Sequence, residues 1–401
     1  MSSAGIEPVR YETLPWQPVG DLDLLSRRRR AMIPGEYRAA VPAQIGGSRP
    51  SVPSWLAAEL DDASAAIVRL DAELGSPRAG EIAPLATVLL RSESAASSRI
   101  ENLTVGARQL ALAELGAEAS RNALEVAGNV AAMEAAVALA GGLDEHSILV
   151  MHEALMRVHD PATAGRWRTQ QVWIGTSSDS PAGAEFVPPH HSRIEAAMRD
   201  LVEFLARDDL PVLLQAALAH AQFETVHPFA DGNGRTGRAL LHALLKGKGL
   251  ATRLTVPISA GLLTDTSGYF AALGSYRDGD VVPIVDQVAR AALRAVGHGR
   301  WLSERLAEVK DGWLASMRFR TGSAGRRLID VLVGQPAVNL RFVEQELDVS
   351  QTAARRAIDQ LTAAGVLSEG TDRRRNRVWI ARDVVEALDD FALRAGRRGP
   401  S

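Results

Sequence analysis

The chain has 401 residues, of which 46% are apolar and 23% charged, a balance typical of a globular protein with two or three domains. Its net charge of −3 gives no overall attraction for nucleic acid or an anionic membrane, and the absence of cysteine excludes thiolate metal sites, catalytic thiols and disulfides. The first residues lack the pattern of a secretory signal and no 18-residue apolar run occurs, so we expect a cytoplasmic protein without membrane contacts.

The N-terminal part combines an irregular start with two expected helices. Residues 1 to about 50 carry six prolines and a Gly-Gly pair, and the four arginines at 27–30 are interpreted as a solvated helix end rather than a nucleic-acid contact. From Ser54 apolar residues recur at helical spacing, and a second helix is expected over IAPLATVLLRSESAASSRIEN (82–102). We assign 1–105 to an N-terminal helical segment.

The remaining chain also favours helices. Helical stretches are expected at 107–140, 144–157 and 192–206, and QVWIG (171–175) with AEFVPP (184–189) predicts a short hairpin as the β element of this middle region. Beyond 300 a helical linker (301–325) precedes a helix, a helix–turn–helix and a β-hairpin, an order typical of a winged helix-turn-helix over 326–400. The fold class is therefore mainly α, with the core at 106–300.

The stretch HPFADGNGRTGR (227–238) satisfies the G-x-G-x-x-G pattern of a dinucleotide-binding turn. That fold requires a strand before the glycines and an acidic residue roughly 20 positions later. The preceding PVLLQAALAHAQFETV has helical spacing instead, and no Asp or Glu occurs from 232 to 264. The dinucleotide interpretation fails, and no G-x-x-x-x-G-K-[ST] supports a P-loop.

A helix, a loop and a second helix starting near 233–234 remain, and this arrangement suits an anion. Gly232 and Gly234 let backbone amides approach closely, and the new helix adds unpaired N–H groups and its positive dipole end. Arg235 and Arg238, three residues apart, project from one side of the first turn. The pattern indicates phosphate binding.

Two side chains of the same loop add reactive chemistry. The Asp231 carboxylate can take a Mg²⁺ ion shared with phosphate oxygens. The imidazole of His227 is the side chain best suited to accept a proton near neutral pH. Together with the backbone amides and the two arginines that form this phosphate-binding cradle, they fit phosphoryl- or nucleotidyl-group transfer to a hydroxyl.

HPFADGNGRTGR resembles the Fic motif, H-x-F-x-[DE]-G-N-G-R-x-x-R, with every defining position matched. Fic proteins are helical enzymes that mostly transfer AMP from ATP to a Ser, Thr or Tyr hydroxyl of another protein. The resemblance implies that His227 deprotonates the target hydroxyl, Asp231 holds Mg²⁺ and Phe229 packs beneath the loop. It implies nucleotide contacts, with Arg238 at the γ-phosphate, from Gly232, Asn233, Gly234, Arg235, Thr236, Gly237 and Arg238.

Two further segments resemble parts of the same family. TDTSGYFAAL occupies the place of the family's Tyr-Tyr pair near the adenine, with Tyr269 kept and Phe270 replacing the second tyrosine. The hairpin resembles the Fic flap, whose edge aligns an extended target segment by strand addition. The resemblance places that edge at Val172, Trp173, Ile174 and Gly175.

SAASSRIENL resembles the Fic inhibitory motif, [ST]-x-x-x-E-[GN], with Ser97, Glu101 and Asn102 at its defining positions. Residues 97 and 101 share a helix face, so the serine can support the glutamate. The resemblance implies that the helix at about 86–102 is inhibitory and that Glu101 pairs with Arg238, which prevents ATP from seating its γ-phosphate. S-x-x-x-E is common by chance, and its place ahead of a complete Fic motif favours this interpretation.

The C-terminal domain offers a function of another class. Arginines on the candidate recognition helix and wing could follow DNA phosphates, yet residues 321–401 hold 13 arginines against 11 acids, and the whole chain has 42 arginines against three lysines. A protein-docking or dimer-forming domain stays open beside a DNA-binding regulator. The candidate DNA contacts are Arg355, Arg356, Arg373, Arg374 and Arg375.

The sequence therefore predicts an autoinhibited protein adenylyltransferase that uses ATP and Mg²⁺ and modifies a protein hydroxyl, its own included. Removal of AMP, with Glu101 orienting a water, and use of another nucleotide donor stay open as alternatives. A homodimer is also expected from the family. His220 is interpreted as a packing or hydrogen-bonding residue and the His190–His191 pair as capping or solvated, while His152 lacks the second histidine, four positions on, of a zinc-protease motif.

Overall fold

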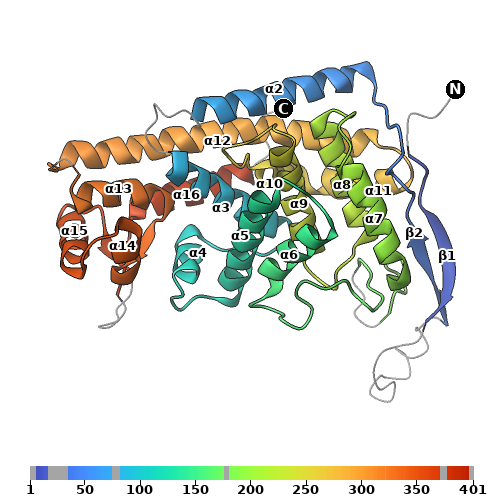
Figure 1. The fold of residues 1–401 in the computed structure, drawn as a ribbon, viewed down its shortest axis with the longest axis horizontal. Coiled ribbons are helices and arrows are strands. Elements are labelled where there is room, and N and C mark those ends of the chain that lie inside the picture. The colour runs from blue at the N-terminus through green and yellow to red at the C-terminus, as the bar shows by residue number, and fades with distance from the viewer. Residues whose placement is uncertain are drawn as a thin grey trace, which may run out of the picture.

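The computed structural model describes residues 6–16, 35–74, 82–175, 180–320, 322–370 and 377–396, and these residues are mainly helical with two small antiparallel sheets (Figure 1). The N-terminal elements are β1 (Arg10–Pro15), β2 (Glu36–Val41), α2 (Ser54–Leu74) and α3 (Ile82–Ile100). The middle elements are α4 (Ala107–Glu114), α5 (Arg121–Leu139), α6 (Glu145–Met156), η3 (His191–Arg193), α7 (Ile194–Leu205), α8 (Val212–Val226) and α9 (Asn233–Gly247). The remaining elements are α10 (Ile258–Leu262), η4 (Leu263–Asp265), α11 (Thr266–Arg277), α12 (Val282–Ser316), α13 (Ala324–Gly334), β3 (Ala337–Asn339), α14 (Leu340–Leu347), α15 (Gln351–Ala363), β4 (Ser368–Glu369), β5 (Val378–Ile380) and α16 (Arg382–Ala395).

The N-terminal segment is not irregular throughout, because β1 and β2 form an antiparallel pair that runs from Arg10 opposite Val41 to Pro15 opposite Glu36. The expectation of an irregular start was wrong there: Pro8 lies before β1 and Pro15 ends it, so proline bounds this strand instead of interrupting it. The arginine run 27–30 lies outside the described residues.

The helices at 54–74 and 82–100 confirm the two helices expected before residue 105. The expected stretch 107–140 is divided into α4 and α5. Gly116, at a φ of 67°, turns the chain, and the Ser120 side chain accepts a hydrogen bond from Ala123 N to start α5. The apolar pattern over 107–140 thus predicted helical structure but not the turn and the N-cap that divide it into two helices.

Helices α8 and α9 lie at the centre of the largest apolar core. Residues 213–226 of α8 are all buried, as expected of a helix surrounded on every side by other elements. The core around it includes Phe204, Phe223, Phe229 and Leu240. The loop between α8 and α9 is thus held on a rigid base.

The hairpin expected at 171–189 is reduced to one β-bridge, between Ile174 and Phe186. The strands do not extend because Pro188 and Pro189 have no N–H to donate, and Val187 O accepts from Ala40 N of β2 at 3.0 Å. Residues 176–179, in the predicted turn, lie outside the described residues.

The C-terminal elements follow the predicted order, with an additional strand, β3, that pairs with β5 in a sheet of order β3-β5-β4. The winged-helix interpretation stays a prediction. Helix α12 continues from 282 to 316, so the predicted boundary at residue 300 falls inside one helix. The linker is therefore continuous with the core.

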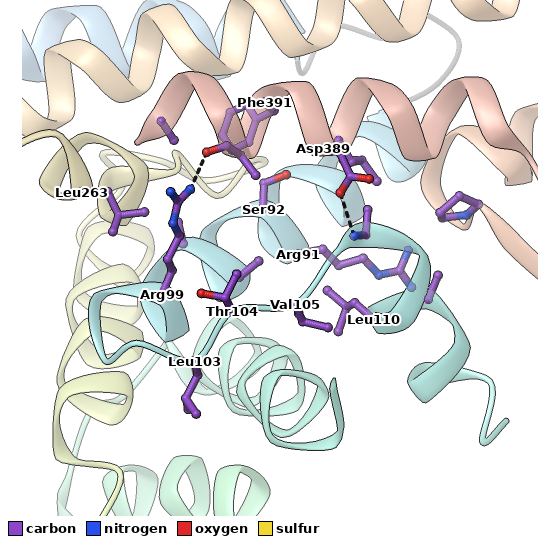
Figure 2. Close-up of a pocket in the computed structure, with 18 of the residues that line it drawn as sticks. Arg91, Ser92, Arg99, Leu103, Thr104, Val105, Leu110, Leu263, Asp389 and Phe391 are labelled. Atoms are coloured by element: carbon purple, nitrogen blue, oxygen red, sulfur yellow. Dashed lines mark hydrogen bonds between the residues drawn. The ribbon is translucent and has the colours of Figure 1, made fainter. Parts of the chain in front are cut away.

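Helix α16 returns to the core and lies beside α3 and α4. Figure 2 shows a pocket of about 90 Å³ between these helices. There Arg99 Nη1 donates to Ala392 O at 2.6 Å, and Asp389 Oδ1 accepts from Ala107 N at 2.9 Å (Figure 2). These contacts fix α3 and the start of α4 to the C-terminal part of the chain.

Among the residues that the structure describes, none of the helices has the length and apolarity needed to cross a bilayer.

Candidate active site

The loop 227–232 begins where α8 ends and stops where α9 starts. His227 terminates α8 in the left-handed region, at φ 49° and ψ 60°, while its N–H still donates to Phe223 O at 2.8 Å. Pro228 cannot continue a helix, and Gly232, at φ 73°, turns the chain into the first turn of α9. The predicted helix–loop–helix is confirmed.

The imidazole of His227 is arranged as a neutral base. Its Nδ1 lies 3.4 Å from Glu224 O, which can only accept, so Nδ1 carries the proton and Nε2 keeps its lone pair. Burial, followed by the positive charges of Arg168 and Arg277, holds the pKa of His227 well below its ordinary value. The ring is therefore unprotonated at neutral pH while its side chain is 19% exposed.

The stacked rings of Phe229 and His152 support the loop from below. Phe229 is fully buried, as predicted, and stacks on His152 with ring centroids 3.6 Å apart. His152 Nδ1 accepts from Gly165 N and Nε2 donates to Asp231 O, both at 3.1 Å. Burial lowers the pKa of His152 to about 4, so it stays neutral. The sequence excluded His152 from a zinc-protease motif but did not predict its bond to the Asp231 backbone.

Asp231 presents the carboxylate to solvent. Its side chain is 57% exposed, with Oδ1 accepting from Gly232 N at 2.7 Å and lying 3.7 Å from Arg235 Nη2. The described residues contain no cluster of three His, Asp or Glu side chains that could enclose a metal ion. One exposed carboxylate suits Mg²⁺, which binds through one or two carboxylates plus substrate phosphates.

The predicted phosphate-binding residues divide into two groups. The side chain of Asn233 is used within the loop, because Oδ1 accepts from Phe229 N at 2.8 Å and Nδ2 donates to Phe229 O at 2.9 Å. Thr236 and Gly237 are buried, the latter against Phe223, so they face the core rather than the anion side. The cradle is thus left to backbone groups at the start of α9 and to the two arginines.

Glu101 contacts both arginines at the start of α9, Arg235 and Arg238. Arg238 Nη2 donates to Glu101 Oε1 at 2.7 Å, and Arg235 Nε lies 2.8 Å from Glu101 Oε2. Both arginine side chains are 3% exposed and Glu101 is 25% exposed. A β-carbon at Gly234 would collide with the same carboxylate, so Glu101 fills the space directly in front of the helix start.

Ser97 acts on the arginine rather than on the glutamate. Arg238 Nε donates to Ser97 Oγ at 2.8 Å, and Arg238 Nη2 donates to Ser97 O at 2.9 Å. The expected support of Glu101 by the serine is therefore indirect: the serine orients the guanidinium that Glu101 binds. The shared helix face predicted the proximity but not the partner.

Comparison with known proteins agrees with this geometry. Residues 142–245 match the Fic/DOC family and residues 57–138 match the Fic/DOC family N-terminal region. The chain therefore contains a Fic/DOC family domain preceded by that family's N-terminal region. It is 32% identical over 146 residues to protein adenylyltransferase fic-1 of Caenorhabditis elegans, covering 36% of this chain and 26% of that protein. It is 30% identical over 152 residues to protein adenylyltransferase Fic of Nematostella vectensis, covering 37% and 32%.

These matches span a third or less of the length of the two relatives. Among solved structures, a Fic family protein from Desulfovibrio desulfuricans G20 superimposes with a TM-score of 0.54 at 20% identity, over 82% of this chain and 97% of that one. This likeness extends the shared fold beyond the residues that match the family in sequence.

The aromatic pair expected beside the adenine lies in two different environments in this Fic chain. Tyr269 is 1% exposed and its hydroxyl lies 2.8 Å from His220 Nε2, so it belongs to the core under α9. Phe270 is 54% exposed, with its ring centroid 5.1 Å from that of Tyr269. His220 is a hydrogen-bonded core histidine, as predicted, and His190 caps η3, as predicted.

The residues predicted to form the flap rest on the antiparallel pair β1–β2 and on Trp16, which follows β1. Trp173 contacts Trp16 edge-on, with ring centroids 5.4 Å apart, and Trp16 also contacts Tyr37 of β2. Gly175, at φ 153°, lies close against Ala184 on the opposite arm. The strands β1 and β2, which the sequence did not predict, are thus part of the flap's support.

Glu224 is a buried carboxyl beside the Fic motif that sequence reasoning missed. Its Oε2 lies 3.8 Å from His227 Nδ1, its Oε1 has no hydrogen-bond partner, and burial raises its pKa to about 7. The folded protein therefore prefers the protonated carboxyl. This preference stabilises the fold fully below the ordinary pKa of 4.5, and the contribution is lost as pH rises through about 7.

We expect Glu224→Gln to flatten the fall in melting temperature between pH 5 and 8, because glutamine stays neutral throughout. Thermal unfolding at several pH values measures this, with Glu134→Gln, an exposed glutamate on α5, as the matched control. Parallel curves for the parent and Glu224→Gln would mean that Glu224 ionises without cost in the folded state.

Proposed function

We propose that this chain is an autoinhibited protein adenylyltransferase that moves AMP from ATP to a Ser, Thr or Tyr hydroxyl of a protein, its own hydroxyls included. The observation that carries the proposal is the single loop in which the neutral Nε2 of His227, the exposed carboxylate of Asp231 and the start of α9 converge, with Glu101 on both arginines.

The residues divide the transfer between them. His227 Nε2 takes the proton of the target hydroxyl, whose oxygen attacks the α-phosphorus. The bond to the β-phosphate oxygen breaks and pyrophosphate leaves. General base catalysis contributes about 10²–10⁴-fold. Backbone N–H groups at the start of α9, with Arg235 and Arg238, stabilise the phosphate charge. Mg²⁺, which Asp231 would hold, neutralises further phosphate charge when bound.

Autoinhibition follows from competition for the arginines. A γ-phosphate and the Glu101 carboxylate seek the same guanidinium donors of Arg238, and an anion cannot seat there while the carboxylate occupies them. ATP is then held in a geometry that does not present its α-phosphorus to His227. Release of Glu101 frees both arginines.

Target docking is assigned to the flap. The arm at 184–187 is bonded to β2 through Ala40 N and Val187 O, so the opposite arm, Val172 to Gly175, is proposed to align an extended target segment by strand addition. A hydroxyl at the end of that segment would lie above His227. The docking edge stays a prediction.

Two alternatives use the same site. Removal of AMP would employ Glu101 to orient a water, and another nucleotide donor would suit the site because the phosphate cradle is better defined than the base site, where Phe270 is exposed. Homodimerisation and a cytoplasmic location also stay predictions.

A DNA-binding role through the C-terminal domain stays an alternative of another class. Arg355 and Arg356 are exposed on α15, but Arg355 Nε pairs with Asp359 at 3.0 Å and its guanidinium lies 5.5 Å above the Trp379 ring. Arg373, Arg374 and Arg375 lie outside the described residues. A salt-dependent shift of duplex DNA, lost on joint substitution of Arg355 and Arg356, would favour this role.

The proposed function is tested by incubating Glu101→Gly with Mg²⁺ and ATP labelled at the α-phosphate, alone and with a cell extract, and by measuring intact mass. Labelled protein and a mass increase of one AMP group are expected. The same reaction with labelled GTP, CTP and UTP identifies the donor. A mass increase with another nucleotide only, or no transfer from any of them, would reject adenylylation.

A further inference from the structure

Arg168 is a buried arginine outside the Fic motif whose guanidinium bonds three backbone carbonyls on separate segments. Its Nε donates to His227 O at 2.9 Å, its Nη1 to Gln170 O at 2.8 Å and its Nη2 to Pro189 O at 2.6 Å. The residue is 5% exposed, and its main-chain N donates to Pro228 O at 3.0 Å. One side chain therefore joins the catalytic loop to both ends of the flap.

Only arginine can make this set of contacts. Its planar guanidinium presents donors in fixed, divergent directions, whereas a lysine ammonium is a compact point charge on a flexible stem. Burial lowers the pKa of Arg168 to about 10, so it is still charged at neutral pH. Removing the guanidinium would leave all three carbonyls without these hydrogen-bond donors.

Arg168 holds the two ends of the flap, whereas β1 and β2 support its arms. Gln170 precedes the first arm, and Pro189 ends the second. Gln171 Nε2 adds a bond to Pro188 O at 2.9 Å, and within the described part of the arms the β-pairing is the bridge between Ile174 and Phe186. The base of the flap is thus fixed next to His227, in addition to the support that its arms receive from β1 and β2.

We propose that Arg168 is a positioning residue that fixes the flap relative to His227, so that a hydroxyl held at the flap edge lies within reach of the imidazole. The inference rests on the proposed adenylyl transfer. A displacement of about 1 Å between reacting groups can cost about 10²-fold in rate. Arg168 makes none of these hydrogen bonds to α9, so we expect its replacement to change nucleotide binding little.

The test compares Arg168→Met and Arg168→Lys in the Glu101→Gly background. Arg168→Met keeps the apolar stem and removes the donors, and it is expected to slow AMP transfer to protein by about 10²-fold, with the Kd for ATP, from titration calorimetry, changed by less than about threefold. Arg168→Lys should recover only part of the rate. Arg207→Met is the matched control, because Arg207 also donates to a backbone carbonyl, that of Gly46 at 3.2 Å, in a segment outside the motif and the flap.

An unchanged transfer rate in Arg168→Met, or an equal loss in Arg207→Met, would overturn the proposal. A second readout needs no activity: in the protein with ¹³C-labelled histidine rings, the His227 signal, assigned with His227→Ala, should shift or broaden in Arg168→Met and stay in place in Arg207→Met. An unmoved signal also rejects the positioning role. If Glu101→Gly itself transfers no AMP while the signal moves, the proposed function fails and the role of Arg168 in placing His227 stands.

Discussion

Glu101→Gly is expected to raise the rate of AMP transfer by about 10²-fold over the parent, because preorganised donors at a reacting phosphate are each worth about 10²–10³-fold. In the parent, Glu101 accepts a hydrogen bond from Arg238 and forms an ion pair with Arg235, so on the proposed mechanism its carboxylate competes with a phosphate for both guanidinium groups. Glycine removes the carboxylate and leaves the arginines in place. The initial rate of labelled-AMP transfer measures the change.

Stability should move in the opposite direction from activity. Removing a carboxylate from two buried guanidinium groups leaves positive charge without its partner, so we expect Glu101→Gly to melt at a lower temperature than the parent. ATP should restore more stability to the variant than to the parent, because binding stabilises by an amount that grows with the ratio of ligand concentration to Kd. Melting curves with and without ATP and Mg²⁺ test this.

Two control variants separate the carboxylate from general effects. Glu118→Gly removes an exposed glutamate from another turn and should leave the rate unchanged. Ser97→Ala should not activate as Glu101→Gly does, since Ser97 bonds Arg238 and its loss disorders the arginine that the γ-phosphate needs. A parent that transfers AMP as fast as Glu101→Gly would show that no inhibition exists.

The contacts of α3 bear on how the proposed inhibition would be released. Glu93 Oε2 accepts from Ser259 N at 2.8 Å, Asn129 Nδ2 donates to Ser94 O at 2.8 Å, and Arg99 holds α16 from the other side. A helix held on three faces resists displacement as a whole. We therefore expect release to act on the last turn of α3 and the Glu101 side chain, rather than through withdrawal of the entire helix.

The motif could be interpreted from sequence because its chemistry is local. His227, Asp231 and the two arginines lie within twelve residues, and a turn between two helices brings them together whatever surrounds it. The contact of Glu101 with Arg238 spans 137 positions and followed from the family resemblance alone.

What the sequence could not predict depends on contacts between distant segments. Arg168 is one of 42 arginines, and only the fold places it against His227 O, 59 positions away. The strands β1 and β2 were missed because each is short and their pairing spans a segment without a hairpin signal. The buried Glu224 was likewise indistinguishable from a surface glutamate.

His227→Ala in the Glu101→Gly background is expected to lower AMP transfer by about 10²–10⁴-fold while the Kd for ATP stays within a few-fold, since the phosphate cradle is on α9. The pKa of His227 is lowered, so the imidazole stays neutral below its ordinary value of 6.5. In the Glu101→Gly protein that still carries His227, the acid limb of the rate–pH profile should therefore lie below pH 6.5.

His227→Asn distinguishes loss of the base from loss of the backbone conformation. The residue has a φ of 49°, which asparagine adopts more readily than alanine, so the turn that ends α8 should persist in the asparagine variant. His146→Ala, at an exposed position in the first turn of α6, is the matched control and should keep the full rate. Equal losses in His227→Ala and His227→Asn would assign the effect to the imidazole. Retention of more than a tenth of the rate in His227→Asn would mean that another group removes the hydroxyl proton, and Glu224, with its Oε2 3.8 Å from His227 Nδ1, would then be the first residue to substitute.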